Sequence, residues 1–208
     1  MTAVPTRDAA TLRTPRRRSV DATRHDTLLN RAAEIVLAEG FTSITVDELA
    51  RRLKCSKSTL YGVAATKELL VIAVTKRFFE RATRQIETEV GSIADPGNRI
   101  IAYLKGVGSA MSDLSASFYQ DMVTYPPTAE IYDINSAAAA RRVRELIEDG
   151  VEQGRLRDID ARFAGHVIAW NIQGIQSGRL QAASGLSAGQ AYLNLGDLLL
   201  KGLGKSSE

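Results

Sequence analysis

Short hydroxyl side chains gather in one stretch of the chain, residues 55–70, which reads CSKSTLYGVAATKELL and carries a lysine towards each end. Serine and threonine hydroxyls donate and accept hydrogen bonds, and a lysine ammonium binds a phosphate or the edge of a guanine. A helix with such an outward face can read base edges in a DNA groove. The same pattern also fits a helical packing unit with a polar face, so both interpretations stay open at this point.

The side chains of this stretch differ in the DNA contacts that they can make. Ser58 and Thr59 can hydrogen-bond to base edges, and the threonine methyl can meet a thymine methyl. Lys57 suits a phosphate or a guanine edge, and Tyr61 can donate to a phosphate. Lys67 stands at a predicted helix start, where backbone amides favour phosphate, or else it is a solvated charge. The candidate DNA-binding residues are Thr45, Ser56, Lys57, Ser58, Thr59, Tyr61 and Lys67.

Signals of helix ends place this hydroxyl cluster on the second helix of a helix-turn-helix. Apolar residues at three-and-four spacing predict a preceding helix that Gly40 ends. Thr45 and Glu48 have the spacing of a capping box, in which the threonine accepts from the amide three residues on and the glutamate reaches back. The helix so begun ends near Leu53, and Ser56 is placed to cap the next one. Thr45 and Ser56 are therefore expected as caps whether or not they also touch DNA.

No window of the sequence alternates with period two, so the predicted fold class is all-α. A long helix is expected from Thr66 to Gly91. Further helices are predicted at residues 98–113, 115–123, 128–152, 160–183 and 187–202. The chain thus divides into a disordered basic arm (1–22), a three-helix helix-turn-helix head (23–66) and a larger helical body for ligand binding and dimerisation (67–208).

Charge is distributed unevenly along the 208 residues. Residues 1–77 hold 14 Lys and Arg against 8 Asp and Glu, whereas residues 78–208 hold 13 against 16. A basic front favours a polyanion such as double-stranded DNA as partner, although arginines in a tail can also serve solubility alone. The single cysteine, Cys55, excludes an internal disulfide, and no apolar run reaches the roughly 20 residues that span a bilayer. These features predict a cytoplasmic protein without a membrane partner.

The spacing of the head resembles that of a known family. The match extends over residues 24–74 and includes TV at 45–46, LA at 49–50, CSKSTLY at 55–61 and KELL at 67–70. This pattern resembles the DNA-binding domain of TetR-family transcription regulators. The resemblance implies an all-helical homodimer that binds a palindromic operator, and a C-terminal helical domain that binds small molecules and pairs the subunits.

The chain departs from the family pattern at two places. Lys54 replaces the usual glycine at the corner of the turn. This corner requires a left-handed backbone conformation, which costs a non-glycine residue on the order of 1 kcal/mol. Gly62, Val63 and Ala64 replace the aromatic residues that usually follow the tyrosine. Base reading is therefore expected to fall more heavily on Ser58 and Thr59.

Aromatic and polar residues in the body have the composition of a small-molecule pocket, with apolar walls and a few polar groups. A plain helical core has the same composition, so each of these residues has both interpretations. Pro126 and Pro127 predict a break between helices that an effector, expected to be largely apolar, could shift. The last two long helices are expected to pair the subunits, or else to pack within one chain. The candidate ligand-binding residues are Tyr103, Phe118, Tyr119, Met122, Tyr125, Phe163, His166, Trp170 and Asn171.

Catalytic and metal-binding patterns are missing from the sequence. His25 and His166 stand far apart, and with one cysteine they make no zinc set by spacing. No nucleophile elbow, Walker loop or dinucleotide-binding glycine motif occurs. We therefore expect no enzyme activity, metal or cofactor. The leading hypothesis is a ligand-responsive repressor, and the competing one is a helical small-molecule-binding or catalytic protein in which the N-terminal helices are only a packing unit.

Overall fold

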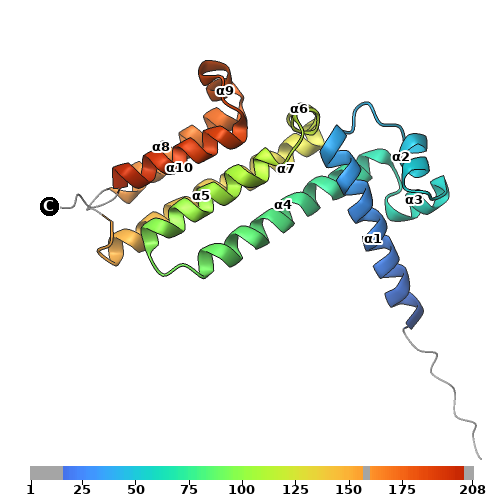
Figure 1. Cartoon of the computed structure of the whole chain (residues 1–208), viewed down its shortest axis with the longest axis horizontal. Helices are drawn as coiled ribbons and strands as arrows, with labels where there is room; N and C mark the ends of the chain where they lie inside the picture. The colour runs from blue at the N-terminus through green and yellow to red at the C-terminus, as the bar shows by residue number, and fades with distance from the viewer. Residues whose placement is uncertain (1–15, 157–159, 204–208) are drawn as a thin grey trace, which may run out of the picture.

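The computed structural model describes residues 16–156 and 160–203, and the regular structure within them is entirely α-helical (Figure 1). The predicted all-α fold class is confirmed. The helices are α1 (Arg16–Glu39), α2 (Val46–Arg52), α3 (Lys57–Val63), α4 (Lys67–Gly91), α5 (Pro96–Ser112), α6 (Ala116–Thr124), α7 (Pro126–Glu152), α8 (Ala161–Gln176), α9 (Arg179–Ser184) and α10 (Ala188–Leu203).

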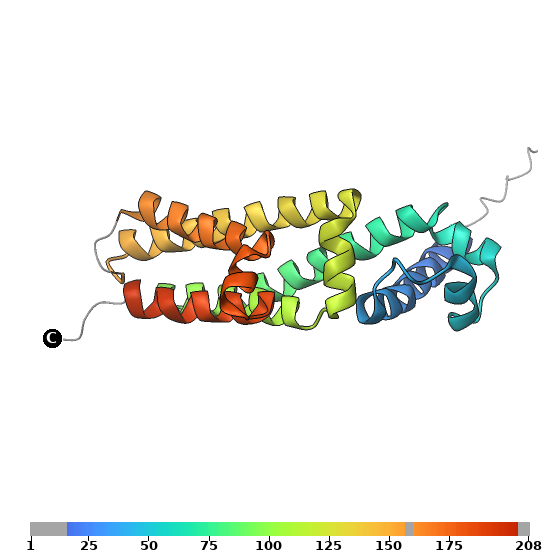
Figure 2. The same ribbon diagram turned by 90° about the horizontal axis from the view of Figure 1, so that it is seen from above.

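The helices form a small head and a longer body, which α4 joins (Figure 1). Helices α1, α2 and α3 make the head, and α4 begins beside them and extends along the body. In the body, α5 packs against α10, and α7 packs against α8. Figure 2 shows α6 crossing between the head and the body helices, next to α1. A structural change in the body can therefore reach the head through α4 and through α6.

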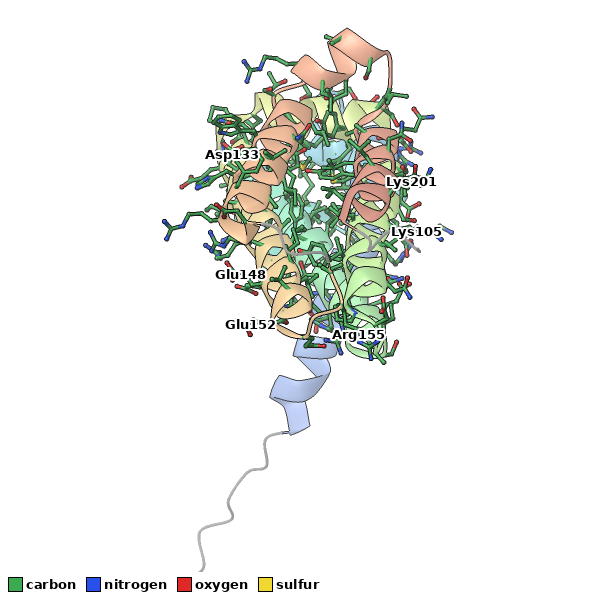
Figure 3. All side chains as sticks on the ribbon, turned by 90° about the vertical axis from the view of Figure 1, so that its left-hand side faces the viewer. Lys105, Asp133, Glu148, Glu152, Arg155 and Lys201 are labelled. Carbon is green, nitrogen blue, oxygen red and sulfur yellow. The ribbon has the colours of Figure 1, made fainter. Side chains whose placement is uncertain are left out.

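One apolar core continues from the head into the body. Its largest fully buried side chains include Phe118, Met122 and Tyr192, each of which contributes roughly 1.5–3 kcal/mol by leaving water. Charged side chains such as Lys105 and Asp133 lie on the outside of the bundle, where they keep their hydration (Figure 3). The predicted division into domains stays a prediction, because α4 packs against helices of both the head and the body.

The two ends of the described chain differ from the sequence-based expectation. Helix α1 begins at Arg16, six residues before the predicted end of the arm, and residues 1–15 of that arm lie outside the described residues, so the arm itself stays a prediction. The single helix expected at 160–183 is two helices, α8 and α9. They are separated because Gly178 adopts a left-handed φ of 71°, a conformation that ends a helix.

The two prolines begin a helix instead of leaving an open break. Helix α7 starts at Pro126, and only Tyr125 separates it from α6. Proline suits the first helical turn, because its missing N–H has no partner there in any residue. The expectation that this break would yield to a ligand therefore has no support in the fold.

Candidate nucleic-acid interface

Two capped helices and a tight turn build the predicted helix-turn-helix. The Thr45 hydroxyl accepts from the Glu48 amide at 3.1 Å, and the Ser56 hydroxyl accepts from the Thr59 amide at 3.1 Å. Between the helices, Lys54 adopts a left-handed φ of 53°. Both predicted caps and the predicted lysine corner are confirmed.

Helix α3 has one inward side chain and a small, polar outward face. Leu60 is only 2% exposed and packs in the core with Leu49 and Leu53, as the spacing predicted. The exposed residues of α3 are Lys57, Ser58, Thr59, Tyr61 and Gly62. This face is free to enter a groove, since nothing else in the described chain packs over it.

Hydrogen bonds among the hydroxyls on this face hold their side chains in place. The Ser56 Oγ lies 2.8 Å from the Ser58 Oγ and 2.8 Å from the Thr59 Oγ1. Each hydroxyl carries one donor and two lone pairs, so these contacts leave capacity for a base edge or a phosphate. The cluster can therefore bind outward without first losing its internal order.

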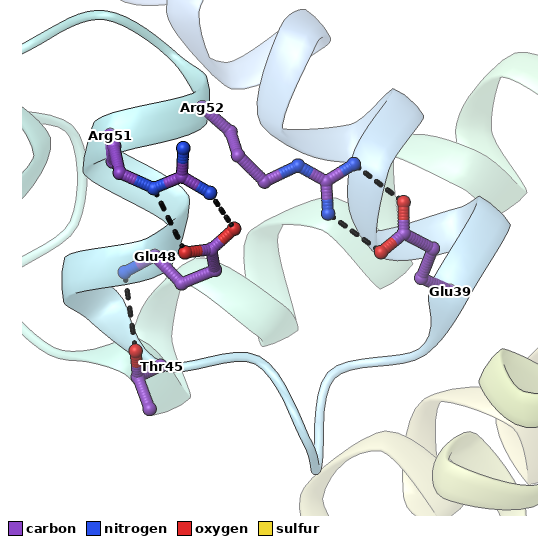
Figure 4. A network of polar contacts seen from close by, with 5 residues as sticks. All are labelled: Glu39, Thr45, Glu48, Arg51 and Arg52. Atoms are coloured by element: carbon purple, nitrogen blue, oxygen red, sulfur yellow. Dashed lines mark hydrogen bonds and ion pairs between the residues drawn. The ribbon is translucent and has the colours of Figure 1, made fainter.

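The cations around the interface are paired with acids, which the sequence reading did not foresee. Arg52 donates two hydrogen bonds to Glu39, and Arg51 donates two to Glu48 (Figure 4). Hydrogen bonding to these arginines holds the pKa of each glutamate below its usual value. The Glu48 carboxylate therefore does not complete the predicted capping box, because it turns to Arg51 instead.

The predicted phosphate ligand Lys57 is also paired. Its ammonium contacts the carboxylate of Asp47, and that hydrogen bond raises the lysine pKa. Both side chains are well exposed, so water screens the pair and it can open when a phosphate approaches. Lys57 is thus a cation whose charge is partly offset before DNA arrives.

The two other predicted phosphate contacts occupy different settings. Tyr61 is 45% exposed near the end of α3, as expected for a side chain that meets an external partner. Lys67 is half-buried at the start of α4, and its Nζ lies 3.5 Å from the Thr42 carbonyl oxygen. Lys67 therefore belongs to the junction between head and body as well as to the candidate interface.

The geometry of the head and its helical body agrees with known regulators. No protein-family model matches the chain. An uncharacterized HTH-type transcriptional regulator of Bacillus subtilis strain 168, YdeS, is 25% identical over 154 residues, which are 71% of this chain and 74% of the relative. A TetR-family regulator from Cytophaga hutchinsonii superposes with a TM-score of 0.68 at 12% identity, covering 90% of this chain and 98% of that one. The chain has the TetR-family fold.

A further similar structure carries a small molecule. A transcriptional regulator from Saccharomonospora viridis, solved in complex with choline, superposes with a TM-score of 0.69 at 17% identity, covering 89% of this chain and 100% of that one. The resemblance predicted from the helix-turn-helix spacing is confirmed at the level of the fold. In the TetR-type fold of this chain, the remaining predicted site residues fall into three different places.

The first place is a polar contact between α6 and the head. The Asp121 carboxylate accepts from the Phe41 amide at 2.6 Å, from the Thr42 amide at 2.8 Å and from the Thr42 hydroxyl at 2.7 Å. Gly40 permits this approach with a φ of 83°, because a Cβ there would lie 2.6 Å from an Asp121 oxygen. We call Gly40, Phe41, Thr42 and Asp121 the head–body latch.

Two predicted ligand-binding residues, Phe118 and Tyr125, lie beside this latch and not in a pocket. Phe41 packs edge-on against Phe118 and Tyr125, with ring centroids 6.0 and 5.8 Å apart. The Tyr125 hydroxyl also donates to Glu68 on α4 at 2.6 Å. These side chains therefore join the body to the head, which the sequence could not indicate because they are separated by more than 50 residues.

The second place is the outer surface of α8. Phe163 and Trp170 are 65% and 74% exposed, and His166 is exposed on the same helix. Asn171 is half-buried and donates to the Val167 carbonyl of its own helix at 2.7 Å. None of these four lines the inner cavity or the outer cleft described below, and Phe163, His166 and Trp170 face away from the bundle.

The third place is an inner cavity of about 50 Å³ between α4, α5, α7 and α10. Tyr103 is the predicted ligand residue that lines it, whereas Met122 is fully buried and Tyr119 packs edge-on against Tyr132 behind the wall. The sequence reading did not include the other aromatic walls among its ligand-binding candidates. The aromatic lining residues are Phe78, Phe79, Tyr103, Tyr132 and Tyr192.

A larger outer cleft of about 590 Å³ adjoins this cavity between α1, α4 and α5. Phe78, Ala82, Ile86 and Ala110 line both spaces and so form a shared wall. The rim of the cleft is charged, with Arg81, Lys105 and Asp113 among its residues. The side chains of this shared wall therefore separate the inner cavity from the outer cleft.

Two further features limit the chemistry of the described residues. Within residues 16–156 and 160–203, no group of three or more His, Cys, Asp or Glu side chains is placed to hold a metal ion. In the same residues no single helix is long and apolar enough to cross a membrane, and the bent pair α3 and α4, at 52°, passes that test by length and composition only.

Proposed function

We propose that the chain is a cytoplasmic, sequence-specific transcription regulator, and that it acts as a ligand-responsive repressor on a palindromic operator. The observation that carries this proposal is the exposed face of α3, where small hydroxyls stand on a capped, core-anchored helix. A recognition helix needs an outward face that fits the major groove and bonds to base edges. The names of the similar proteins, which are transcriptional regulators, support the same function.

The roles of the interface residues follow from their contacts. Ser58 and Thr59 read base edges, because their hydroxyls lie on the outward face and keep free lone pairs. Thr45, Ser56 and Tyr61 position the helix on phosphates, and Lys57 joins them once it leaves Asp47.

Homodimerisation is the second part of the proposal, and the outer surfaces of α8 and α10 support it. Both helices lie along one side of the body (Figure 1). They expose large apolar side chains, and contiguous apolar surface of this kind marks a protein–protein interface. These side chains are Phe163, Trp170, Leu193 and Leu198. A symmetric dimer through this face would present two α3 helices to successive major grooves, roughly 34–36 Å apart or a multiple of that.

Control by a small molecule is the third part. The inner cavity touches α4, which continues into the head, and Tyr132 and Phe79 link its wall to α7. An effector that enlarges the cavity would shift α4 and change the separation of the two recognition helices. The choline complex of the Saccharomonospora viridis protein supports small-molecule binding by a protein of this fold. Such coupling is typically 1–3 kcal/mol, about 5- to 150-fold in affinity, and it is reciprocal.

An electrophoretic mobility shift assay with genomic fragments at moderate salt tests the DNA-binding part. We expect Thr59→Ala to cost about 1–3 kcal/mol at particular base pairs and to relax the preference there. Lys67→Ala should weaken binding to every sequence and lower the salt slope by about 1. The matched control is Thr88→Ala, an exposed threonine on the body that bonds only to the Arg84 carbonyl.

Two results would contradict the proposal. If no fragment is retarded by wild-type protein at micromolar concentration, the competing hypothesis of a helical small-molecule-binding protein gains the advantage. If Thr59→Ala and Thr88→Ala behave alike on every fragment, the outward face of α3 does not read DNA.

A further inference from the structure

We propose that the effector is an uncharged molecule that carries an oxygen able to accept a hydrogen bond from Tyr132. This inference rests on the proposed function, since it takes the inner cavity as the effector site. It goes further by assigning the chemical class of the ligand and the residue that selects it.

The charge of the ligand follows from the cavity wall. Its polar members are the three tyrosines together with Thr83, Asn135 and Ser136, and no lining residue carries a charge. The nearby guanidinium of Arg142 is already taken by two hydrogen bonds to Glu87, at 3.0 and 3.1 Å. A carboxylate or ammonium in this cavity would lose its hydration without gaining a counter-ion, and the aromatic faces would return only part of that cost to a cation. A neutral ligand escapes that cost.

The hydrogen bond follows from Tyr132. Its side chain is 3% exposed, and its ring stacks on Phe79 and meets Tyr119 edge-on, with centroids 6.2 and 6.0 Å away. The hydroxyl is buried and makes no hydrogen bond of good geometry, although the hydroxyls of Tyr119 and Tyr192 lie close enough for weak ones. Leaving a buried hydroxyl without a well-aligned partner destabilises the empty cavity, so a ligand that accepts from it binds more tightly than one that does not.

The direction of this hydrogen bond follows from protonation. Burial raises the pKa of Tyr103 and of Tyr192 to about 12, and it raises that of Tyr132 further. All three phenols therefore keep their protons in the range in which the protein would work. Tyr132 keeps a proton for which neither neighbouring hydroxyl is a well-aligned acceptor, so the complementary ligand group is a carbonyl, ether or hydroxyl oxygen.

A pair of probe molecules of nearly equal shape isolates the oxygen. Cyclohexanone carries an acceptor, and methylenecyclohexane replaces it by carbon. Cyclohexylamine, protonated at pH 7, and cyclohexanecarboxylate supply the two charged forms of the same ring. Each is titrated into the full chain by saturation-transfer NMR, and operator retardation is measured on the same samples.

The variants are Tyr132→Phe and the matched control Tyr119→Phe. Tyr119 lies next to Tyr132 but does not line the cavity, and its hydroxyl accepts from Gln181 at 3.3 Å. We expect Tyr132→Phe to weaken cyclohexanone roughly 5- to 100-fold and to leave methylenecyclohexane within about 2-fold. Tyr119→Phe should leave both probes unchanged. Tyr132→Phe should unfold at the same or a higher temperature, because it removes an unpaired buried hydroxyl.

The outcomes separate this inference from the proposed function. The ligand class is overturned if Tyr132→Phe loses affinity equally for the ketone and the hydrocarbon. It is also overturned if a charged probe binds as tightly as the ketone. A protein that retards operator but binds no probe also overturns it, while DNA binding stands. If cyclohexanone binds through Tyr132 yet no probe alters operator affinity, the ligand class is supported and the regulatory part of the proposed function fails.

Discussion

Asp121→Asn tests whether the head–body latch holds the two parts of the molecule together. The carboxylate accepts three hydrogen bonds, from two amides and one hydroxyl, at 2.6 to 2.8 Å. An asparagine keeps the shape and one acceptor oxygen, but it turns an NH₂ group towards donors. We expect the substitution to break at least one of these bonds and to loosen α6 from α1.

The magnitude follows from the exposure of the three contacts. A hydrogen bond to a charged group contributes roughly 1.5–3 kcal/mol when water cannot replace it. Only the bond from the Phe41 amide is partly buried, while the two from Thr42 are exposed and can be replaced by water. The expected loss is therefore about 1–3 kcal/mol, not the sum of three full bonds. For a chain of this size, each kcal/mol lowers the melting temperature by about 2–4 °C.

The pH dependence of the latch gives a second measure. Partial burial raises the pKa of Asp121, but hydrogen bonds from Thr42 and Phe41 and the charge of Lys67 outweigh it, so the pKa lies below its usual value. A carboxyl with a lowered folded pKa contributes stability that is present above its unfolded pKa, about 3.9, and is lost as pH falls through the folded value. The difference between wild type and Asp121→Asn should thus be constant from pH 7 to 5 and shrink below about pH 4.

Urea denaturation followed by circular dichroism at pH 7, 5 and 3.5 measures both effects. The matched control is Asp133→Asn, which removes an exposed carboxylate on the outside of the bundle (Figure 3). If Asp121→Asn is as stable as this control at pH 7, the three short contacts contribute nothing measurable. If its deficit grows as the pH falls, the sign of the pKa argument is wrong.

Three further predictions concern the interface and the dimer. Gly62→Ala should raise the free energy of unfolding by about 0.5–1 kcal/mol in urea denaturation, because a Cβ at this helical position meets no other atom. The same variant should weaken operator retardation, because the added methyl stands on the outward face of α3, and tighter binding would contradict this. Asp47→Asn removes the acid paired with Lys57 and should strengthen binding to all DNA, with a salt slope steeper by up to about 1. An unchanged slope in a salt titration would show that Lys57 contacts no phosphate. Phe163→Asp should shift sedimentation towards the monomer and move the fluorescence emission of Trp170, the single tryptophan, to longer wavelength. A variant that sediments like the wild type would place the dimer face elsewhere.

The sequence by itself determined the head, because its signals are local. Each cap joins a hydroxyl to an amide three residues on, at Thr45, Ser56 and Thr66, so the spacing of neighbouring residues suffices to locate it. The apolar periodicity placed Leu60 inward in the same way. The left-handed corner at Lys54 came from the family resemblance and agrees with the observed φ.

Only the tertiary structure decided which body residues form a pocket, a latch or a surface. An aromatic residue on an amphipathic helix can face a cavity, a neighbouring chain or solvent, and the spacing within that helix is the same in each case. Phe163 and Trp170 face outward and Tyr132 inward because of the way α7 and α8 rotate against their neighbours. The acids that pair with Arg52 and with the Phe41 amide lie 13 and 80 residues away, so only the packed chain brings them within reach.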